Sequence, residues 1–537
     1  MPERPHRDRR RPRRARPPAA LRPRLADPLP GSRPVRQGLL AAGRVPALLP
    51  GARDRRRLLP LLPPPACLLA ALRSRPARRS AAQALLRQRA AARARTRPEA
   101  LPRRRVSVPP RPAALARCLA TALALTANGA SVGAQPPRYP DVLVITVDTL
   151  RPDRLGAWGH ARPTSPAIDA LLGEGLRFAE ARTVEPLTTP ALASLWTSVP
   201  PHVHGSTRNG LPIRSGLASL PRLLGRRGFR TAAVLGNWTL KDQLSGLAGE
   251  WQHYELLTSR KRWFGLFKDE ARGRDLTDSV LAWLADSRTE SATRPLLLWV
   301  HYVEPHAPYR LQADFAPRLG ISPERATDLD RYDSEIAAVD AEVARLLAGW
   351  RERSPERPLL TVFLADHGEA FGEHGEHGHG RLVHEPTLRI PLGFHWPGRI
   401  PAGVAHDAVS TLDVAPTLLG LLGLPAHPTF AGRDLAPRFA GEPVAERPIC
   451  VQAHKGAVQS VQAAARARRA GLIEAGVVAA GQLEALALGR GERRLYDLQA
   501  DPDERRSLVD PKSPASESLT ACLDAIRAGL TAADQVP

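Results

Sequence analysis

The chain has 537 residues, which is enough for a large buried core and for more than one domain. Its formal net charge of +24 suggests nucleic-acid binding, but this charge is unevenly distributed. The first 135 residues contain 31 of the 77 basic residues and only 5 of the 53 acidic residues. They therefore carry a net charge of +26, and the rest of the chain carries −2. The remainder also lacks a basic stripe with interleaved aromatic residues, which argues against nucleic-acid recognition by the globular part of the chain.

Residues 1–105 are dominated by Arg, Pro, Ala and Leu and show no sustained helical or strand period. Such a composition does not supply a packed core, so we expect a disordered tail. A polyanion-binding arm is one interpretation, and a nucleic-acid-binding function would depend on this tail alone. The plainer alternative is a solvated extension, or a stretch upstream of the true start.

Residues 106–138 resemble a secretory signal followed by a linker. Two arginines precede the apolar run Leu119–Leu125, and small residues follow up to Ala134. The run is too short to span a bilayer. If translation starts near Val106 or Val108, we expect export to the periplasm or the medium, whereas a start at the first residue weakens that expectation.

The four cysteines show no metal-type spacing. Cys67 and Cys118 fall in the tail and the signal-like segment. Cys450 and Cys522 can form one disulfide, but the spacing alone does not decide this.

From residue 139 to residue 425, short apolar runs alternate with amphipathic segments. The runs are typical of strands buried on both faces, and they are DVLVITV (141–147), TAAVLG (231–236), PLLLWVHY (295–302), LLTVFLA (359–365) and LRIPLGF (388–394). The segments between them predict helices at Ser165–Gly175, about Pro190–Ser198, Leu217–Arg226, Leu276–Asp286 and about Asp330–Arg351. This alternation predicts an α/β sandwich with a mainly parallel central sheet flanked by helices.

A second region covers residues 426–537. It begins with a Pro- and Gly-rich connection that ends at Pro448, and it continues as a smaller unit that contains RLYDLQADPDERRSL (494–508). We therefore expect a separate subdomain at the C-terminal end.

Polar side chains stand at the carboxyl ends of two predicted strands. Asp148 follows DVLVITV, and Asp366 and His367 follow LLTVFLA. Ligands of open α/β sheets gather beyond such strand ends. Two carboxylates and an imidazole suit one divalent cation, and Mn, Zn, Mg and Ca are all compatible. For Asp148 alone, capping of the next helix is an equally good interpretation.

The stretch EPLTTPALASLWTS (185–198) places two threonines before a proline and an apolar helix. Thr188 is expected at the start of this helix, where free backbone N–H groups and the helix dipole favour negative charge. A simple N-cap is the alternative for Thr188 or Thr189. Beside a cation held by the acids and imidazole above, however, the Thr188 hydroxyl can ionise and attack a sulfate or phosphate ester.

Eight motifs, in matching order, resemble the sulfatases of the alkaline phosphatase superfamily. They are DVLVITVDTLRPDRLGAWGHARPTSPAIDAL, PLTTPALASLWTS, GFRTAAVLGNW, HYVEPHAPY, YDSEIAAVDAEV, ADHGEAFGEHGEHGHG, STLDVAPTLLGLLGL and LYDLQADPDE. Each motif alone is weak, but together they span about residues 140–508. The resemblance implies an alkaline-phosphatase-like α/β catalytic domain over residues 139–425 and a small C-terminal α/β subdomain over residues 426–537.

Carried over by position, the resemblance also implies a metal site with a nucleophile. Asp148, Asp366 and His367 fall on metal ligands. Thr188 falls on the nucleophile, which is also a metal ligand.

Histidines beyond the metal site fall into two groups under the same resemblance. His306 in EPHAPY matches a substrate-contacting histidine, which can hold the transferred group or protonate the leaving oxygen. His379 lies in a GHG motif that is near the site in many relatives, and a solvated loop is its alternative. His374 and His377 fit such a solvated Gly/His loop.

The sequence departs from the sulfatase pattern at the nucleophile. Sulfatases carry Cys or Ser in C/S-x-P-S-R, which is converted to formylglycine, whereas this chain reads TTPAL (188–192), so the conversion cannot occur at Thr188. The motif's arginine is Leu192, the second aspartate of the usual DD is Thr149, and the lysine of G-K-W-H is Asn237. Each change removes a positive charge or a hard ligand from a site that holds an anion.

A threonine nucleophile resembles instead the superfamily's nucleotide phosphodiesterases and its phosphoethanolamine or glycerophosphate transferases. The phosphodiesterases usually add a second metal through an Asp-x-x-x-His element. Asp333 and Asp340 lack the following histidine, so we expect one metal and a surface or structural role for Asp340.

The leading hypothesis is therefore an exported, metal-dependent hydrolase or transferase that acts through Thr188 on a sulfate or phosphate ester of a small molecule, glycan or lipid. The alternative is a catalytically weak or inactive binding protein with the sulfatase fold, which the residues Leu192 and Asn237 favour. We expect no transmembrane helix.

Overall fold

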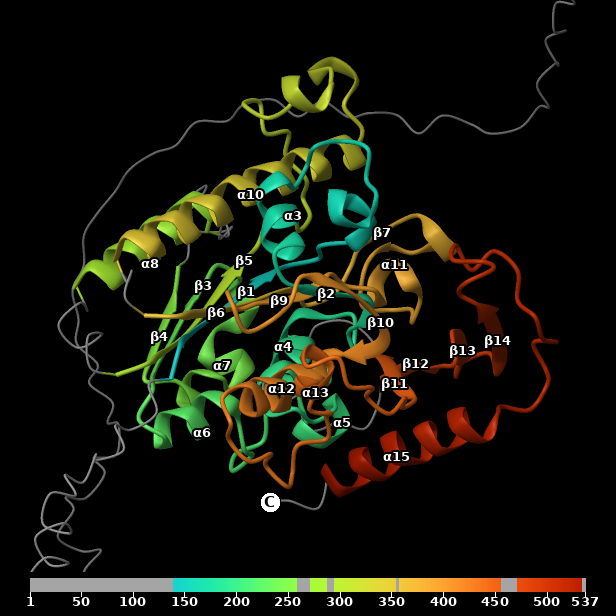
Figure 1. Cartoon of the computed structure of the whole chain (residues 1–537). Coiled ribbons are helices and arrows are strands. Elements are labelled where there is room, and N and C mark those ends of the chain that lie inside the picture. The colour runs from blue at the N-terminus through green and yellow to red at the C-terminus, as the bar shows by residue number, and fades with distance from the viewer. Residues whose placement is uncertain (1–138, 258–270, 287–293, 354–356, 455–470, 534–537) are drawn as a thin grey trace, which may run out of the picture. The chain divides into compact units, whose positions relative to one another are not determined.

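The computed structural model describes residues 139–257, 271–286, 294–353, 357–454 and 471–533 (Figure 1). The expected tail over residues 1–105 and the signal-like segment up to residue 138 lie outside the described residues. Within the described ranges, no helix combines the length and the apolar character needed to cross a membrane.

An eight-stranded sheet forms the centre of the described chain, with the strand order β10-β2-β9-β6-β1-β5-β3-β4. The strands are β1 (Asp141–Val147), β2 (Leu176–Arg182), β3 (Arg230–Leu235), β4 (His253–Leu256), β5 (Leu296–Tyr302), β6 (Leu359–Ala365), β9 (Leu392–His395) and β10 (Gly403–Ser410). Neighbouring strands are parallel except in the two pairs made by β9. The predicted mainly parallel sheet is confirmed.

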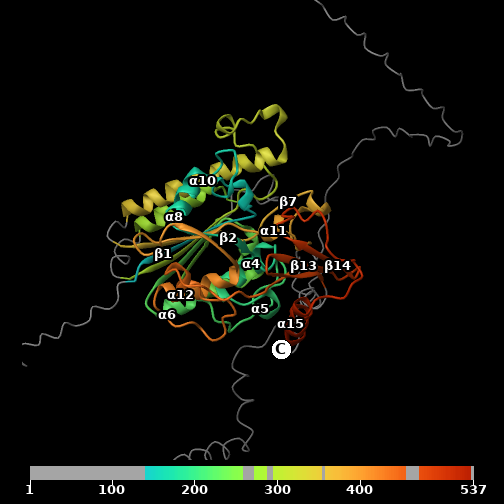
Figure 2. The same ribbon diagram turned by 45° about the vertical axis from the view of Figure 1, so that its right-hand side comes forward.

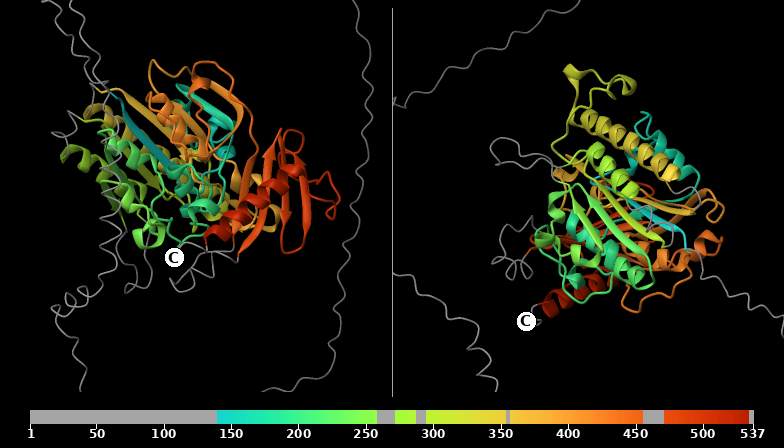
Figure 3. Two further views of the ribbon diagram at one scale, coloured as in Figure 1. Left: turned by 90° about the horizontal axis from the view of Figure 1, so that it is seen from below. Right: turned by 90° about the vertical axis from the view of Figure 1, so that its left-hand side faces the viewer.

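Helices cover both faces of this sheet, as Figure 1 and the right panel of Figure 3 show. One layer contains α3 (Pro166–Gly173), α8 (Gly273–Asp286) and α10 (Asp328–Arg353). The other contains α4 (Thr188–Thr197), α6 (Leu220–Arg226), α7 (Asp242–Ser245) and α12 (Val414–Leu421). Because both faces are covered, every residue of β1 and β5 is buried, which explains their continuous apolar sequences.

The run LRIPLGF (388–394) differs from its prediction. Only its second half is a strand, β9, and this strand is antiparallel to both neighbours. Leu388 instead ends the short helix α11 (Glu385–Leu388). Pro391 lies between the two elements and has no backbone N–H for a sheet ladder, so it divides the run.

Further short elements are α5 (Pro201–His204), α13 (Ala436–Phe439) and a small hairpin of β7 (Ala370–Phe371) and β8 (His377–Gly378).

The C-terminal part forms its own antiparallel sheet, ordered β11-β12-β13-β14 (Figure 2). Its strands are β11 (Ile449–His454), β12 (Leu472–Ala479), β13 (Gln482–Ala487) and β14 (Glu492–Asp497), and helix α15 (Glu517–Ala533) packs against it. Cys450 and Cys522 form a disulfide between β11 and α15. The predicted small C-terminal α/β subdomain is confirmed.

Packing of α4 fixes one side of the carboxyl edge of the large sheet. Every residue of this helix is buried. Trp196 near its end packs against Trp251 and against Trp299 of β5, with ring centroids 4.8 Å and 5.1 Å away. These aromatic contacts connect the helix that begins at Thr188 to the centre of the sheet.

Candidate active site

The two acids and the imidazole predicted from the strand ends lie together. Val147 pairs with Ala365 in the parallel β1–β6 ladder, so Asp148 and Asp366 leave the sheet at the same edge. Nε2 of His367 lies 3.7 Å from Oδ1 of Asp148 and 3.5 Å from Oδ2 of Asp366. All three side chains are buried. Asp148 therefore belongs to this cluster rather than capping a helix.

Thr188 joins the same cluster from the other side. Its Oγ1 lies 3.4 Å from Nε2 of His367. Thr188 is the first residue of α4, whose N-cap is Leu187, and no side chain caps this end. The neighbouring Thr189 is used differently, since its backbone N–H donates to Asn209 and its hydroxyl donates to the backbone oxygen of Thr239. The N-cap alternative for Thr188 is wrong, because its hydroxyl faces the cluster.

His306 and His379 line the partly exposed side of this cluster. The ring of His379 lies 4.3 Å from that of His367 and 5.3 Å from that of His306. Nδ1 of His379 is 2.9 Å from Oε1 of the buried Glu369, and Nδ1 of His306 is 2.6 Å from the backbone oxygen of Ala307. These bonds fix both ring orientations, so His379 does not belong to a solvated loop.

The other two histidines of the loop lie away from the cluster. His374 pairs with Glu504 at 3.3 Å and stacks on His384, with ring centroids 3.7 Å apart. His377 is exposed. Only His379 of this Gly/His loop approaches the predicted site residues.

Sequence reasoning missed two side chains that contact Asp148. Nε2 of His301 lies 3.5 Å from Oδ2 of Asp148, and the amide of Asn237 donates to the same oxygen. His301 pairs with Thr146 in the β1–β5 ladder and thus reaches the same edge. The sequence signal that could have identified His301 was a single imidazole inside the otherwise apolar run PLLLWVHY.

The cluster fits a divalent cation. The ligand atoms of Asp148, His301 and Asp366 all lie within 4.8 Å of one another. One atom of each, namely Oδ1 of Asp148, Nε2 of His301 and Oδ2 of Asp366, has no hydrogen-bond partner among the described residues although it is buried. Three buried polar atoms that face one another without partners are costly unless a cation lies between them.

Electrostatics of the two acids support the same conclusion. Burial raises the pKa of Asp366, and the neighbouring Asp148 carboxylate raises this pKa further. Burial opposes ionisation of Asp148 as well, but the contact with His301 and the other nearby imidazoles bring its pKa below the usual range. A bound cation would allow both carboxylates to be ionised together.

Asp333 and Asp340 have structural roles elsewhere. Asp340 is buried, and its Oδ1 accepts the backbone N–H groups of Ala167 and Ile168 at the start of α3. Asp333 accepts two hydrogen bonds from the guanidinium of Arg154. Of the two roles expected for Asp340, the structural one is therefore confirmed and the surface position is wrong.

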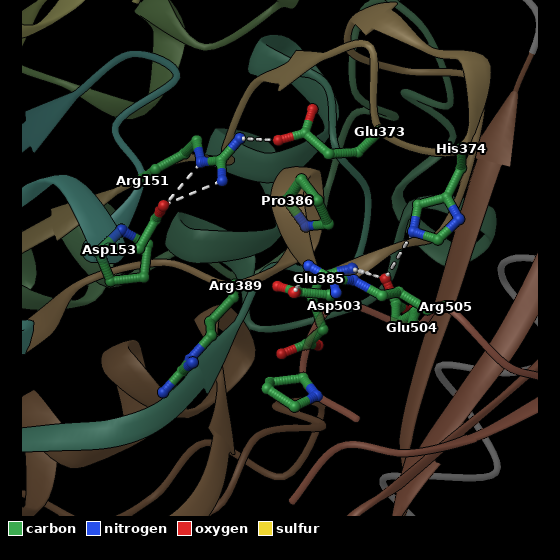
Figure 4. Close-up of a pocket in the computed structure, with 12 residues that line it drawn as sticks. Arg151, Asp153, Glu373, His374, Glu385, Pro386, Arg389, Asp503, Glu504 and Arg505 are labelled. Atoms are coloured by element: carbon green, nitrogen blue, oxygen red, sulfur yellow. Dashed lines mark hydrogen bonds and ion pairs between the residues drawn. The ribbon is translucent and has the colours of Figure 1, made fainter. Parts of the chain in front are cut away.

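A cavity of about 640 Å³ lies outside the cluster (Figure 4). Its wall includes Arg151, Glu373, His374 and Glu504, and none of the six predicted site residues. Arg151 forms ion pairs with Asp153 and with Glu373, as the dashed lines in Figure 4 show. The charge of Arg151 is thus compensated within the wall of this cavity.

Comparison with known proteins gives a consistent family assignment. The family model described as Sulfatase matches residues 140–424. The N-acetylgalactosamine-6-sulfatase of Canis lupus familiaris is 27% identical over 389 residues, which cover 61% of this chain and 71% of the relative. Human arylsulfatase A is 26% identical over 371 residues, which cover 58% of this chain and 70% of the relative.

Solved structures share the fold. A Bacteroides thetaiotaomicron protein, solved in work on the metabolism of multiple glycosaminoglycans, aligns with a TM-score of 0.60 at 17% identity and covers 74% of this chain and 100% of its own. The phosphonate monoester hydrolase of Agrobacterium radiobacter aligns with a TM-score of 0.55 at 20% identity. The alignment covers 73% of this chain and 94% of the hydrolase.

Proposed function

Because the chain belongs to the sulfatase family of the alkaline phosphatase superfamily, we propose that it hydrolyses a singly charged sulfate or phosphate ester with Thr188 as the nucleophile. In this proposal Asp148, Asp366 and His367 hold one divalent cation, and Thr188 is its fourth ligand. The observation that carries the proposal is the position of the Thr188 hydroxyl, 3.4 Å from His367 and inside a buried cluster of acids with unpartnered oxygens.

The residues divide the reaction between them. A divalent cation, when bound, supplies the Lewis acidity that favours the alkoxide of Thr188. The Thr188 hydroxyl loses its proton to solvent, Oγ1 attacks the sulfur or phosphorus atom, a new bond to this atom forms, and the bond to the ester oxygen breaks. The leaving oxygen takes a proton from His306 or His379, which line the accessible side of the cluster. Attack by water on the Thr188 ester then regenerates the hydroxyl and releases the acid, whereas an acceptor hydroxyl in place of water would make the reaction a transfer.

Charge around the nucleophile selects among esters. Leu192 and Asn237 stand where the family pattern has an arginine and a lysine, and Asn237 uses its amide to donate to Asp148. The two ionised acids neutralise the charge of a bound divalent cation. Only the imidazoles then remain to balance the negative charge of the substrate. A sulfate monoester or a phosphate diester carries one negative charge and fits this site better than a doubly charged phosphate monoester.

Sugar-linked esters are the first natural candidates to test. A curated relative is named for a sulfate on N-acetylgalactosamine. One solved structure with a TM-score of 0.57 is described in complex with its substrate D-glucosamine-2-N,6-O-disulfate. Lipid-linked and small-molecule esters remain part of the proposal.

The experiment compares p-nitrophenyl sulfate, bis(p-nitrophenyl) phosphate and p-nitrophenyl phosphate as substrates of the purified, metal-loaded protein. We expect turnover of one or both singly charged esters, a lower kcat/KM for the doubly charged ester, and a loss of roughly 10³-fold or more in Thr188→Ala. Thr189→Ser is the matched control, because the serine hydroxyl can still donate to the backbone oxygen of Thr239, as the Thr189 hydroxyl does. Equal activity of Thr188→Ala and the wild type would rule out this nucleophile.

A binding protein without turnover is the second candidate, and Leu192 and Asn237 favour it because they remove two cations from the family pattern. The same experiment decides between the two. A wild-type protein that binds a divalent metal and one of these esters, measured by calorimetry, but releases no p-nitrophenol from any of them would support binding without catalysis.

Export of the protein is part of the proposal. The disulfide between Cys450 and Cys522 supports it, because such bonds persist mainly in oxidising compartments. The secretory-signal-like segment that ends near residue 135 supports it from the sequence.

A further inference from the structure

We propose that His301 is a direct ligand of the divalent cation, so that the site consists of two carboxylates, two imidazoles and Thr188 and prefers a zinc-like transition metal to calcium or magnesium. This inference rests on the proposed function, since it concerns the same metal site. It adds a ligand and a metal preference that the family comparison does not assign.

His301 reaches the cluster from the strand next to β1. It is the sixth residue of β5 and pairs with Thr146 across the ladder, one position before Val147 pairs with Tyr302. Its side chain is completely buried, and Nε2 lies 3.5 Å from Oδ2 of Asp148. No hydrogen bond to this nitrogen occurs within the described part of the chain.

Hydrogen bonds around Nδ1 of His301 are compatible with a lone pair on Nε2. The indole N–H of Trp299 only donates, and it donates to Oγ1 of Thr146 at 2.8 Å. Oγ1 of Thr146 lies 2.8 Å from Nδ1 of His301 and 3.4 Å from the backbone oxygen of Val300. In the tautomer in which this hydroxyl donates to Val300 and accepts Nδ1–H, Nε2 carries a lone pair toward the acids, and metal binding at Nε2 selects this tautomer.

In this tautomer no proton lies between Nε2 of His301 and the Asp148 carboxylate, 3.5 Å apart, so a cation between the two atoms would stabilise both. Ligand atoms at about 2.0–2.2 Å from one ion lie roughly 3–4 Å from one another. The Nε2–Oδ2 distance of His301 and Asp148 falls in this range, as do the two distances from His367 to the acids. His301 thus has the spacing of a ligand and a partner on its other nitrogen, which is the usual arrangement of metal-bound histidines.

The ligand set determines the metal preference. Imidazole suits zinc and other transition metals, whereas calcium and magnesium prefer sites made of oxygen atoms. A site with His301 and His367 therefore favours zinc more strongly than a site with one imidazole. Removal of His301 should lower zinc affinity much more than calcium affinity.

The test measures zinc and calcium dissociation constants by competition with chelating dyes, without substrate. His301→Asn is the main variant, because asparagine keeps a polar atom near the Nδ1 position for Thr146 but does not reach the cation. We expect its zinc affinity to fall by roughly 100-fold or more, with a calcium affinity within about tenfold of the wild type. Thr146→Val, which removes the hydroxyl beside Nδ1 of His301 together with its bond from the Trp299 indole, should weaken zinc binding by a smaller factor of about 10.

Two further variants make the result decisive. His377→Ala removes an exposed loop histidine and should leave the zinc affinity unchanged. His301→Gln places an amide oxygen near the former Nε2 position, so its zinc affinity should lie between those of the wild type and His301→Asn. This variant decides the case if thermal unfolding shows that His301→Asn does not fold.

Zinc affinity of a folded His301→Asn or His301→Gln protein within about threefold of the wild type would overturn the inference and would show that His301 only donates a hydrogen bond to Asp148. The proposed function would survive that result if Thr188 were still required for turnover. Conversely, a His301-dependent zinc affinity in a wild-type protein that hydrolyses none of the test esters would support the ligand and contradict the proposed function.

Discussion

At the scale of single residues, the candidate site depends on where a few polar atoms are left without partners. The acids Asp148 and Asp366 and the imidazole of His301 present unpartnered atoms to one another in the buried cluster. Asp340, by contrast, uses Oδ1 locally at the start of α3. Single unpartnered atoms also occur elsewhere in the described chain, so the distinguishing feature of the site is that three of them converge.

Sequence reasoning predicted six side chains that lie near one another in the structure. Asp148, Asp366 and His367 follow strands and Thr188 opens a helix, whereas His306 and His379 came from the family motifs. The same reasoning missed His301 because this residue lies inside a strand, where a single imidazole more often fills the core. Its position opposite Thr146 depends on the neighbour of β1 in the sheet, and strand order is not encoded in the local pattern. The role of Asn237 was hidden for the same reason.

Glu335 of α10 provides a residue-scale prediction of pH dependence. Burial raises its pKa to about 8. Within the described chain, Oε1 accepts the backbone N–H of Arg310 and Oε2 has no hydrogen-bond partner. Because its folded pKa exceeds its unfolded pKa of 4.5, the folded state favours the neutral acid. The stabilising contribution is complete below pH 4.5 and is lost as the pH rises toward 8.

Glu335→Gln cannot ionise, so its free energy of unfolding should decline less than that of the wild type between pH 5 and pH 8. The difference should reach about 2 kcal/mol or more at pH 8. Urea unfolding at several pH values measures it, with the exposed Glu324→Gln as the control. Parallel pH profiles of the wild type and Glu335→Gln would contradict the buried, neutral state of this acid.

At the scale of elements, burial explains which predictions succeed. The five predicted helices are confirmed with boundaries within three residues, because each has an apolar face against the sheet. The strands β2, β4 and β10 were missed, since partly buried positions and charged side chains interrupt their apolar sequences. The strand predicted over residues 388–394 was too long at its start, because Pro391 has no backbone N–H and the strand β9 begins only after it.

Helix α4 gives the prediction at this scale. Trp196 is completely buried and packs edge-to-face on Trp251. Trp196→Ala should lower the free energy of unfolding by about 3–5 kcal/mol, because it leaves a large cavity beneath the helix. It should also lower kcat/KM, since the helix that carries Thr188 loses its support.

Trp196→Phe is the matched variant, because it keeps an aromatic ring at the contact and should lose less of both quantities. The measurements are urea unfolding and hydrolysis of the best p-nitrophenyl ester. A Trp196→Ala protein with reduced stability but unchanged kcat/KM would show that the packing of α4 does not position the nucleophile.

At the scale of the whole molecule, the C-terminal sheet and α15 contribute a disulfide-linked subdomain. The bond between Cys450 and Cys522 closes a sequence separation of 72 residues. The double variant Cys450→Ser/Cys522→Ser should lose about 2–5 kcal/mol of stability. Thermal unfolding with and without a reductant provides the check, since the reductant should lower the midpoint of the wild type only. An equal effect of the reductant on both proteins would contradict the disulfide.

The charge of the whole chain shows how far composition can be used. The net charge of +24 arises from residues that precede the described structure, whereas the part that contains the site is nearly neutral. Electrostatic arguments about the substrate therefore depend on Leu192, Asn237 and the imidazoles near Thr188. The total charge gives no information about the substrate.

The central claim is that Thr188 becomes covalently bonded to the transferred group. Rapid acid quenching of the metal-loaded protein during turnover, followed by peptide mass spectrometry, tests this directly. The account predicts a sulfuryl or phosphoryl group on Thr188, with none on Thr189 and none in Thr188→Ala. Steady turnover with this group found on a different side chain, or on no residue at all, would contradict it.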